Sequence, residues 1–168
     1  MKFQIKSIIS LIVLLITFQS NSIAQDRQYI FTPNVGLTIP VLDNGVGFHI
    51  GINPAYRITQ RLYIEGQLSY SYTDINGSFL SGGKGNDWAV NTLFGPRLYI
   101  NSEDKKNRFY LNLLAGAVYH TEKRDGRSDD TDFELGYSAG IYYEMGRLML
   151  GLSVDSPGYF VLKVGVRI

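Results

Sequence analysis

The chain has 168 residues, including 18 glycines and no cysteine, with 13% aromatic and only 18% charged residues. This length allows one domain, and the lack of cysteine excludes a disulfide framework and a thiolate zinc site. Its 16 basic and 15 acidic residues give a net charge of +1, without the basic excess of a nucleic-acid-binding protein, so we expect no nucleic acid partner. Few charges with many glycines and aromatic residues favour β-structure with an apolar exterior.

The first 24 residues have the pattern of a secretory signal peptide. Lys2 and Lys6 precede an apolar run over residues 8–18, and Ser22 and Ala24 place small residues where signal peptidase cuts. The run is well short of the ~20 residues that a membrane-spanning helix needs, which disfavours a retained anchor. We therefore expect a signal peptide over residues 1–24 and a single barrel domain over residues 25–168.

From Tyr29 onward, apolar and polar residues alternate with a period of two, as in strands with two different faces. The eight alternating segments cover residues 29–39, 48–58, 62–72, 88–100, 108–120, 133–144, 148–154 and 160–168. We expect long loops over residues 73–87 and 121–132, and tight turns at Thr59–Arg61 and Gly146–Arg147. Long loops on one side and short turns on the other are typical of outer-membrane barrels. The extracellular loops would be exposed, and an even number of strands would leave both mature termini in the periplasm.

The two-residue turn at Gly146–Arg147 predicts the register of its hairpin, pairing Tyr143 with Leu150 and Tyr142 with Gly151. The loop over residues 73–87 does not fix a register in the same way. Similar depth on adjacent strands nevertheless predicts an interior ion pair between Glu65 and Arg97, shared with Arg57.

Glycines and charges indicate which face of the sheet is inside. Most strand glycines lie on the polar face, where small residues suit the crowded interior of an eight-stranded barrel. The clear mid-strand charges share that face, and the other face must then tolerate lipid. We predict an all-β, eight-stranded, antiparallel up-and-down transmembrane β-barrel. Its expected lumen ion network is Arg57, Glu65, Arg97, Glu144, Lys163 and Arg167. A soluble lipocalin-like barrel, which would bury the apolar face, is the alternative.

Aromatic residues of the apolar face lie mostly near the strand ends. Rings of amphipathic side chains at both water boundaries form the girdle of a membrane barrel. The expected girdle comprises Tyr29, Tyr56, Tyr72, Trp88, Tyr119, Phe133, Tyr143 and Phe160.

Three stretches carry a family resemblance: Asn53–Ile58, the hairpin arm Leu62–Tyr70 and the closing alternation Phe160–Ile168. On these, the mature chain resembles the eight-stranded outer-membrane β-barrel family, OmpA/OmpX-like, particularly short porin-like barrels without a periplasmic domain. The resemblance implies the outer membrane of a Gram-negative bacterium and contact with membrane lipid and lipopolysaccharide. It also implies folding by periplasmic chaperones and the outer-membrane insertion machinery, and a monomer.

Candidates for catalysis are few. His49 and His120 are the only histidines, and the parity of their strands places both on the lumen face, away from the outer leaflet. His120, Thr121 and Glu122 could form part of a hydrolytic site, but polar residues near a barrel mouth are the favoured interpretation. We therefore expect no enzyme and no catalytic residues.

Two further stretches invite a ligand. Asp129, Asp130, Asp132 and Glu134 could offer oxygen ligands to a divalent cation, although a solvated loop is favoured. The glycine-rich stretch over residues 82–85 lacks the Ser or Thr and the helix of a phosphate-binding loop. We expect no metal site and no cofactor.

The favoured function is a structural or surface-interaction barrel, with residues 73–87 and 121–132 carrying any binding. One alternative is a narrow passive pore for small solutes, although eight strands leave an interior just wide enough for side chains to fill. A less favoured alternative is an outer-leaflet lipid-modifying enzyme, for which loss of activity in His120→Ala would be the discriminating result.

Overall fold

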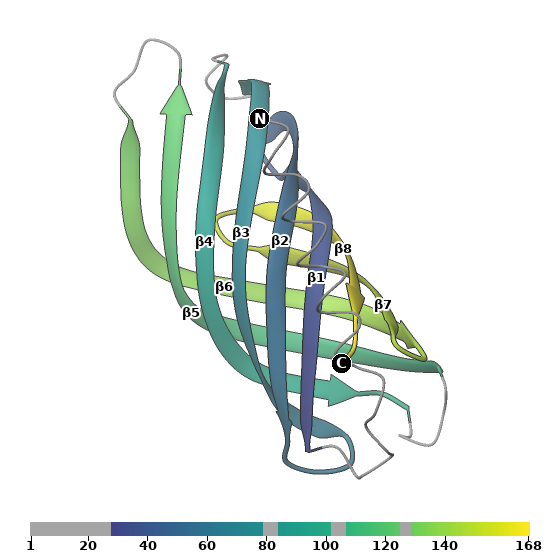
Figure 1. Cartoon of the computed structure of the whole chain (residues 1–168). Coiled ribbons are helices and arrows are strands. Elements are labelled where there is room, and N and C mark those ends of the chain that lie inside the picture. Colours follow the sequence, from purple (N-terminus) through teal and green to yellow (C-terminus); the bar gives the residue numbers. More distant parts are fainter. Residues whose placement is uncertain (1–27, 79–83, 102–106, 125–128) are drawn as a thin grey trace, which may run out of the picture.

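The computed structural model describes residues 28–78, 84–101, 107–124 and 129–168, so the expected signal peptide lies outside the described residues. The strands are β1 (Tyr29–Pro40), β2 (Asp43–Arg57), β3 (Leu62–Ser78), β4 (Gly85–Tyr99), β5 (Asn107–Arg124), β6 (Asp130–Met145), β7 (Leu148–Asp155) and β8 (Tyr159–Val166). Each strand pairs antiparallel with the next in the chain, and β1 also pairs with β8, which closes the barrel (Figure 1). The predicted eight-stranded up-and-down β-barrel is therefore confirmed. Among the described residues no helix is long and apolar enough to cross a membrane.

Alternation along each strand produces an apolar exterior and a polar lumen. On β1, for example, Val35 and Leu37 are more than half exposed, whereas Asn34 and Thr38 are buried. Large hydrophobic residues of this outward face form a belt around the barrel, which suits contact with lipid tails. A soluble barrel would bury these side chains instead.

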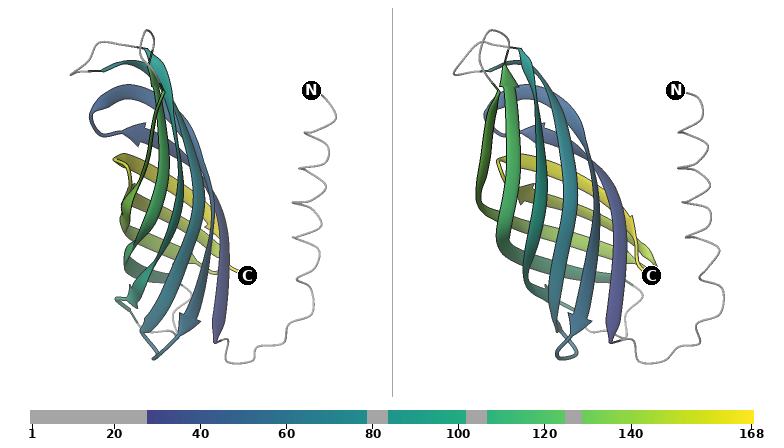
Figure 2. Two further views of the ribbon diagram at one scale, coloured as in Figure 1. Left: turned by 90° about the vertical axis from the view of Figure 1, so that its left-hand side faces the viewer. Right: turned by 60° about the vertical axis from the view of Figure 1, so that its left-hand side comes forward.

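The wall of the barrel is uneven in height. β2 to β6 have 15 to 18 residues each, whereas β7 and β8 have eight each. We call the end at which β3 to β6 extend furthest the mouth, and the end with the turns at Thr59–Arg61 and Gly146–Arg147 the base. The yellow β7–β8 hairpin ends below the tips of β5 and β6, so the wall is low on that side (Figure 2).

The expectation of long loops over residues 73–87 and 121–132 is corrected here, because the described residues of both segments are largely strand. Thr73–Ile75 pairs with Gly85–Asp87, and β5 continues to Arg124 before β6 begins at Asp130. These segments rise beyond the apolar belt, where both faces are polar and the alternation fades. Main-chain pairing continues there without a hydrophobic signal in the sequence.

The hairpin at Gly146–Arg147 has the predicted register. Met145 pairs with Leu148, so the connection has two residues, and Tyr142 pairs with Gly151. Gly146 has a φ of 62°, a left-handed conformation that glycine adopts at no steric cost. A glycine at the first central position is typical of a two-residue hairpin turn of type II′.

Candidate functional site

The base half of the lumen holds a network of buried charges. Arg97 Nε lies 2.5 Å from Glu65 Oε2, and Arg97 Nη1 lies 3.8 Å from Glu144 Oε1. Arg108, which we did not expect in the network, contacts Glu144 Oε2 through Nη2 at 2.6 Å. Arg167 Nη1 reaches Glu144 Oε2 at 3.5 Å from a more exposed position. Opposite charges therefore meet across the lumen and fill it.

Four tyrosines stack against this network, an arrangement that the sequence analysis missed. They are Tyr63, Tyr99, Tyr110 and Tyr142, and neighbouring ring centroids are 4.6 to 5.3 Å apart. The guanidinium carbon of Arg97 lies 4.2 Å from the Tyr110 ring centroid, and that of Arg108 lies 4.2 Å from the Tyr99 centroid. Cation–π contacts of this kind are strongest where water is excluded.

Of the remaining expected lumen residues, Lys163 contacts a further carboxylate, that of Asp155. Lys163 Nζ contacts Asp155 Oδ2 at 2.8 Å, and Gln67 and Ser138 donate hydrogen bonds to the same carboxylate. Arg57 is half-buried at the base end of β2. These side chains pack the described part of the lumen at successive levels, which gives the pore alternative no support.

The girdle residues point outward at both ends of the apolar belt. Toward the mouth, the ring centroids of Trp88 and Tyr119 are 5.4 Å apart, and Tyr119 pairs with Phe133. Toward the base, the centroids of Tyr29 and Tyr56 are 4.9 Å apart. The other expected members, Tyr72, Tyr143 and Phe160, share this outward face.

One residue beyond Trp88 and Tyr119, the inward face carries an imidazole–carboxylate pair. His120 Nε2 of β5 lies 2.5 Å from Asp87 Oδ1 of β4, and the two side chains are 16% and 10% exposed. Burial alone would lower the pKa of His120, but the hydrogen bond and charge of Asp87 outweigh burial. With Glu122 and Glu134 nearby, the pKa of His120 is raised above its ordinary value of 6.5. Asp87 was missed because it falls in a segment expected to be loop.

Of the trio His120, Thr121 and Glu122, the structure does not bring Thr121 to the imidazole, whereas Glu122 shares the inward face with His120. Thr121 lies on the opposite face of β5, and its hydroxyl is 3.2 Å from that of Thr131. Glu122 accepts a hydrogen bond from Arg124 at 2.5 Å. Asp87 is the hydrogen-bond partner of His120 among the described residues. The chemistry available here is proton transfer by an imidazole that a carboxylate orients.

An apolar floor closes the lumen beneath this pair. Its members, Ala89, Val118, Tyr159 and Val161, are buried against one another. The Tyr159 hydroxyl is buried close to Asp87 and Thr73. His120 and Asp87 therefore lie on the mouth side of this apolar floor, with their side chains 16% and 10% exposed.

The other histidine lies deeper. His49 is 1% exposed, and its Nδ1 atom is 3.0 Å from Ser71 Oγ. The two side chains form an imidazole–hydroxyl pair, but their complete burial in the packed lumen leaves no room for a substrate.

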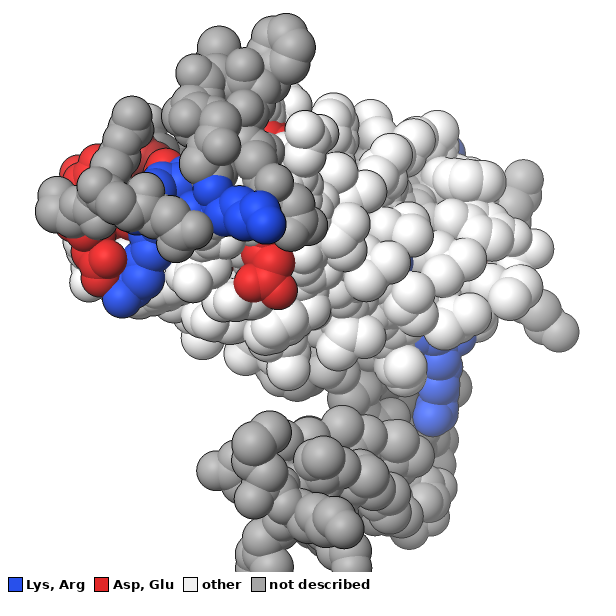
Figure 3. Space-filling model, turned by 90° about the horizontal axis from the view of Figure 1, so that it is seen from above, with Lys and Arg blue, Asp and Glu red and all other residues white. Residues whose placement is uncertain are grey.

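Charged side chains gather at the mouth, beside a wall that is almost free of charge (Figure 3). Lys123 Nζ and Asp129 Oδ2 are 2.6 Å apart, and Arg124 contacts Asp43 at 2.6 Å. Among the described residues no group of three or more His, Cys, Asp or Glu side chains could hold a metal ion.

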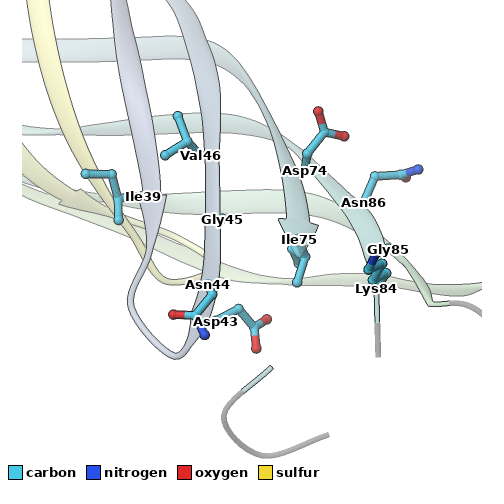
Figure 4. Close-up of a pocket in the computed structure, with 10 residues that line it drawn as sticks. All are labelled: Ile39, Asp43, Asn44, Gly45, Val46, Asp74, Ile75, Lys84, Gly85 and Asn86. Atoms are coloured by element: carbon cyan, nitrogen blue, oxygen red, sulfur yellow. The ribbon is translucent and has the colours of Figure 1, made fainter. Parts of the chain in front are cut away.

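An open pocket of about 770 Å³ lies at the mouth ends of β2, β3 and β4, lined by Asp43, Asp74, Lys84 and Asn86 among others (Figure 4). Its carboxylates have partners already, because Asp43 binds Arg124 and Asp74 accepts a hydrogen bond from the Tyr72 hydroxyl at 2.7 Å. Mixed charges of this kind do not indicate one class of ligand.

The model of the lipid A 3-O-deacylase (PagL) family matches residues 44–155, from the start of β2 to the end of β7. The chain belongs to this family. PagL is named for an enzymatic activity, so this finding corrects the expectation of no enzyme. That expectation treated a lumen-facing histidine as sealed from lipid, whereas the side chain of His120 is partly exposed at a mouth whose wall is low on one side.

Solved structures show the same fold. The Yersinia pestis attachment invasion locus protein Ail, in complex with the heparin analogue sucrose octasulfate, aligns with a TM-score of 0.56 at 18% identity, covering 83% of this PagL-family chain and 97% of Ail. Neisserial surface protein A aligns with a TM-score of 0.56 at 14% identity, covering 83% of this chain and 95% of that one. No match was found among curated proteins. The chain is thus an eight-stranded outer-membrane barrel.

Proposed function

We propose that this chain hydrolyses a fatty acyl ester of a lipid A-type glycolipid, with His120 as the general base and Asp87 as the group that orients it. The observation that carries this proposal is the match to the deacylase family over residues 44–155, which include both residues. His120 and Asp87 also form an imidazole–carboxylate pair outside the packed lumen. We further propose that the mouth faces the cell exterior, where such glycolipids reside, and that the mature termini are periplasmic.

The pair supports ester hydrolysis by direct attack of water, because no serine or threonine hydroxyl bonds to His120 among the described residues. His120 takes a proton from the attacking water, and a tetrahedral intermediate forms at the ester carbonyl carbon. Its collapse breaks the bond to the alkoxy oxygen, which receives the proton from His120. Asp87 holds the ring and stabilises the imidazolium. The products are a free fatty acid and a glycolipid with one acyl chain fewer.

The test is the release of fatty acid from lipopolysaccharide by the full chain, refolded in detergent micelles and followed by mass spectrometry. General acid–base catalysis contributes roughly 10²- to 10⁴-fold, so His120→Ala should reduce the rate by about that factor. Asp87→Asn should also reduce it, whereas Asp129→Asn, at the same mouth but paired with Lys123, should not.

Heat-modifiability on gels would show that each variant barrel is folded. A wild-type rate in folded His120→Ala would overturn the role of His120. Absence of release by the wild-type chain would overturn the hydrolase proposal.

A second candidate is a surface-interaction role at the mouth. The charged extension of β3 to β6 beyond Trp88 and Tyr119 favours it, because exposed charges such as Lys123 and Asp129 reach furthest from the belt. Replacing both with serine should then weaken adhesion of expressing cells to a lipopolysaccharide-coated surface and leave fatty acid release unchanged. Unchanged adhesion would count against this candidate.

A further inference from the structure

The mouth end of β6 has no paired strand on the side away from β5 among the described residues. β6 pairs with β5 as far as Asp130, but with β7 only from Ser138 toward the base. At the tip of the β7–β8 hairpin, the Ser156 main-chain N–H donates to the Tyr137 carbonyl oxygen at 2.8 Å. The Tyr137 N–H donates to Ser156 Oγ at 2.7 Å. Beyond Tyr137, no described strand lies on that side of β6.

The free edge directs the main chain of Phe133 and Leu135 into this gap. In an antiparallel sheet, alternate residues turn their N–H and C=O groups toward the same neighbouring strand. Tyr137 faces the β7 side, so Leu135 and Phe133 face it too. Their side chains, at 81% and 75% exposed, are the two most exposed large hydrophobic residues described. The missing strand explains this exposure.

The unpaired main chain of β6 lies at the level of the apolar belt, where water is scarce. Phe133 pairs with Tyr119, whose ring packs on Trp88, so Phe133 lies at the aromatic boundary and Leu135 lies two residues farther into the belt. Main-chain polar groups that face lipid tails without a partner are strongly unfavourable. A polar group carried by a membrane component could satisfy them.

We propose that the main-chain edge at Phe133 and Leu135 binds the polar linkage groups, ester, amide or hydroxyl, of an acylated glycolipid that enters over the β7–β8 hairpin. The β7–β8 hairpin ends below the tips of β5 and β6, so that β7 does not pair with the part of β6 that carries Phe133 and Leu135 (Figure 2). This inference rests on the proposed function, because it takes the same lipid as the ligand. It assigns that lipid a route and a set of main-chain contacts.

Two observations favour a lipid over a second copy of the chain. The edge beyond Tyr137 is short, and the hairpin tip that bonds to Tyr137 limits the length of any strand that could pair there. On the neighbouring strand His120 pairs with Asp132, the residue next to Phe133, so the gap adjoins the candidate catalytic pair. A glycolipid held at this edge has its acyl linkages near His120.

Amide hydrogen exchange tests the contact directly. We would use the His120→Gln chain, which keeps the lipid intact, in phosphatidylcholine nanodiscs with and without lipid A. The N–H groups of Phe133 and Leu135 should exchange at least tenfold more slowly when lipid A is present. Leu111, an outward residue paired with both β4 and β6, is the control and should not change.

Equal exchange with and without lipid A would overturn the proposal. Protection that rises with protein concentration in lipid A-free discs would also overturn it, because a second copy would then cover the edge. Slow exchange with lipid A in a wild-type chain that releases no fatty acid would support the binding edge while the hydrolase proposal failed.

Two variants at position 135 distinguish a main-chain contact with the lipid from a side-chain contact. Leu135→Pro removes one N–H, which an edge position tolerates, whereas Leu135→Ala keeps it. Leu135→Pro should abolish the lipid A-dependent protection of Phe133 and raise the KM for release about tenfold relative to Leu135→Ala. Equal behaviour of the two heat-modifiable barrels would overturn the assignment.

Discussion

Arg97 on β4 donates a hydrogen bond of 2.5 Å through Nε to Oε2 of Glu65 on β3, and both side chains are no more than 1% exposed. The amide nitrogen of Asn53 donates to the other carboxylate oxygen of Glu65, also at 2.5 Å. Glu65 therefore has partners for both oxygens. Removing either charge leaves the other buried without its short ion-pair partner, and Arg97 then keeps only the longer contact of 3.8 Å with Glu144.

We expect Glu65→Ala and Arg97→Ala each to lower the free energy of unfolding by about 3–5 kcal/mol, the usual cost of breaking a buried ion pair. The double variant should cost less than the sum, because it leaves no lone charge. Urea unfolding from lipid vesicles measures this cycle. A coupling below about 0.5 kcal/mol would contradict it.

The ring of Tyr142 lies over two lumen glycines. A Cβ atom at Gly151 or Gly140 would overlap that ring, because a tyrosine on β6 covers its own strand and the paired strand. Gly151→Ala should therefore destabilise the barrel by about 1–3 kcal/mol, the usual cost of overpacking. At Gly66 a Cβ would meet the Pro54 ring at 3.4 Å and the Leu93 carbonyl oxygen at 3.8 Å, which are ordinary contacts. Gly66→Ala is the matched control for urea unfolding, and equal effects of the two substitutions would refute this account.

Alternation and turn length were enough to predict the register of the hairpin that contains Tyr142. Strict alternation fixed the two faces, and a two-residue turn leaves one register, so the pairing of Tyr142 with Gly151 followed from the sequence. Alternation also placed Arg108 and Lys163 on the lumen face. Their partners could not be assigned, because barrel closure brings together residues far apart in the chain, such as Gln67 and Asp155.

The candidate site was harder to predict than the wall. Asp87 lies where both faces of β4 are polar, so the alternation of apolar and polar residues did not predict a strand there. Its contact with His120 could therefore not be predicted from the sequence. The height of the wall depends on where β7 and β8 end relative to β6, a relation between strands that local pattern does not encode. Parity correctly turned His120 inward, but it did not reveal that the mouth is open beside Phe133.

Orientation in the membrane can be tested by labelling, since the natural chain has no cysteine. In intact cells, a membrane-impermeant maleimide should label Asp129→Cys at the mouth. Gln60→Cys, in the tight turn at the base, should react only after the outer membrane is opened. The reverse pattern would invert the proposed topology.

His120 makes both stability and activity depend on pH. Its pKa is raised in the folded barrel, so pairing with Asp87 contributes stability that is fully present below about pH 6.5, the unfolded value. That contribution is lost as pH rises through the folded-state pKa. The urea concentration at the midpoint of unfolding should therefore decrease as the pH rises from 6 to 9. Asp87→Asn should flatten this dependence, with Asp129→Asn as the control.

The activity should depend on the same group. A general base must be neutral, so the rate of fatty acid release should rise as the pH rises through the pKa of His120. Loss of the Asp87 charge should move that rise to lower pH and reduce the maximal rate, because the ring is no longer oriented. NMR titration of His120 gives the pKa independently, and a value below 6.5 in the folded barrel would contradict the ion pair as the cause.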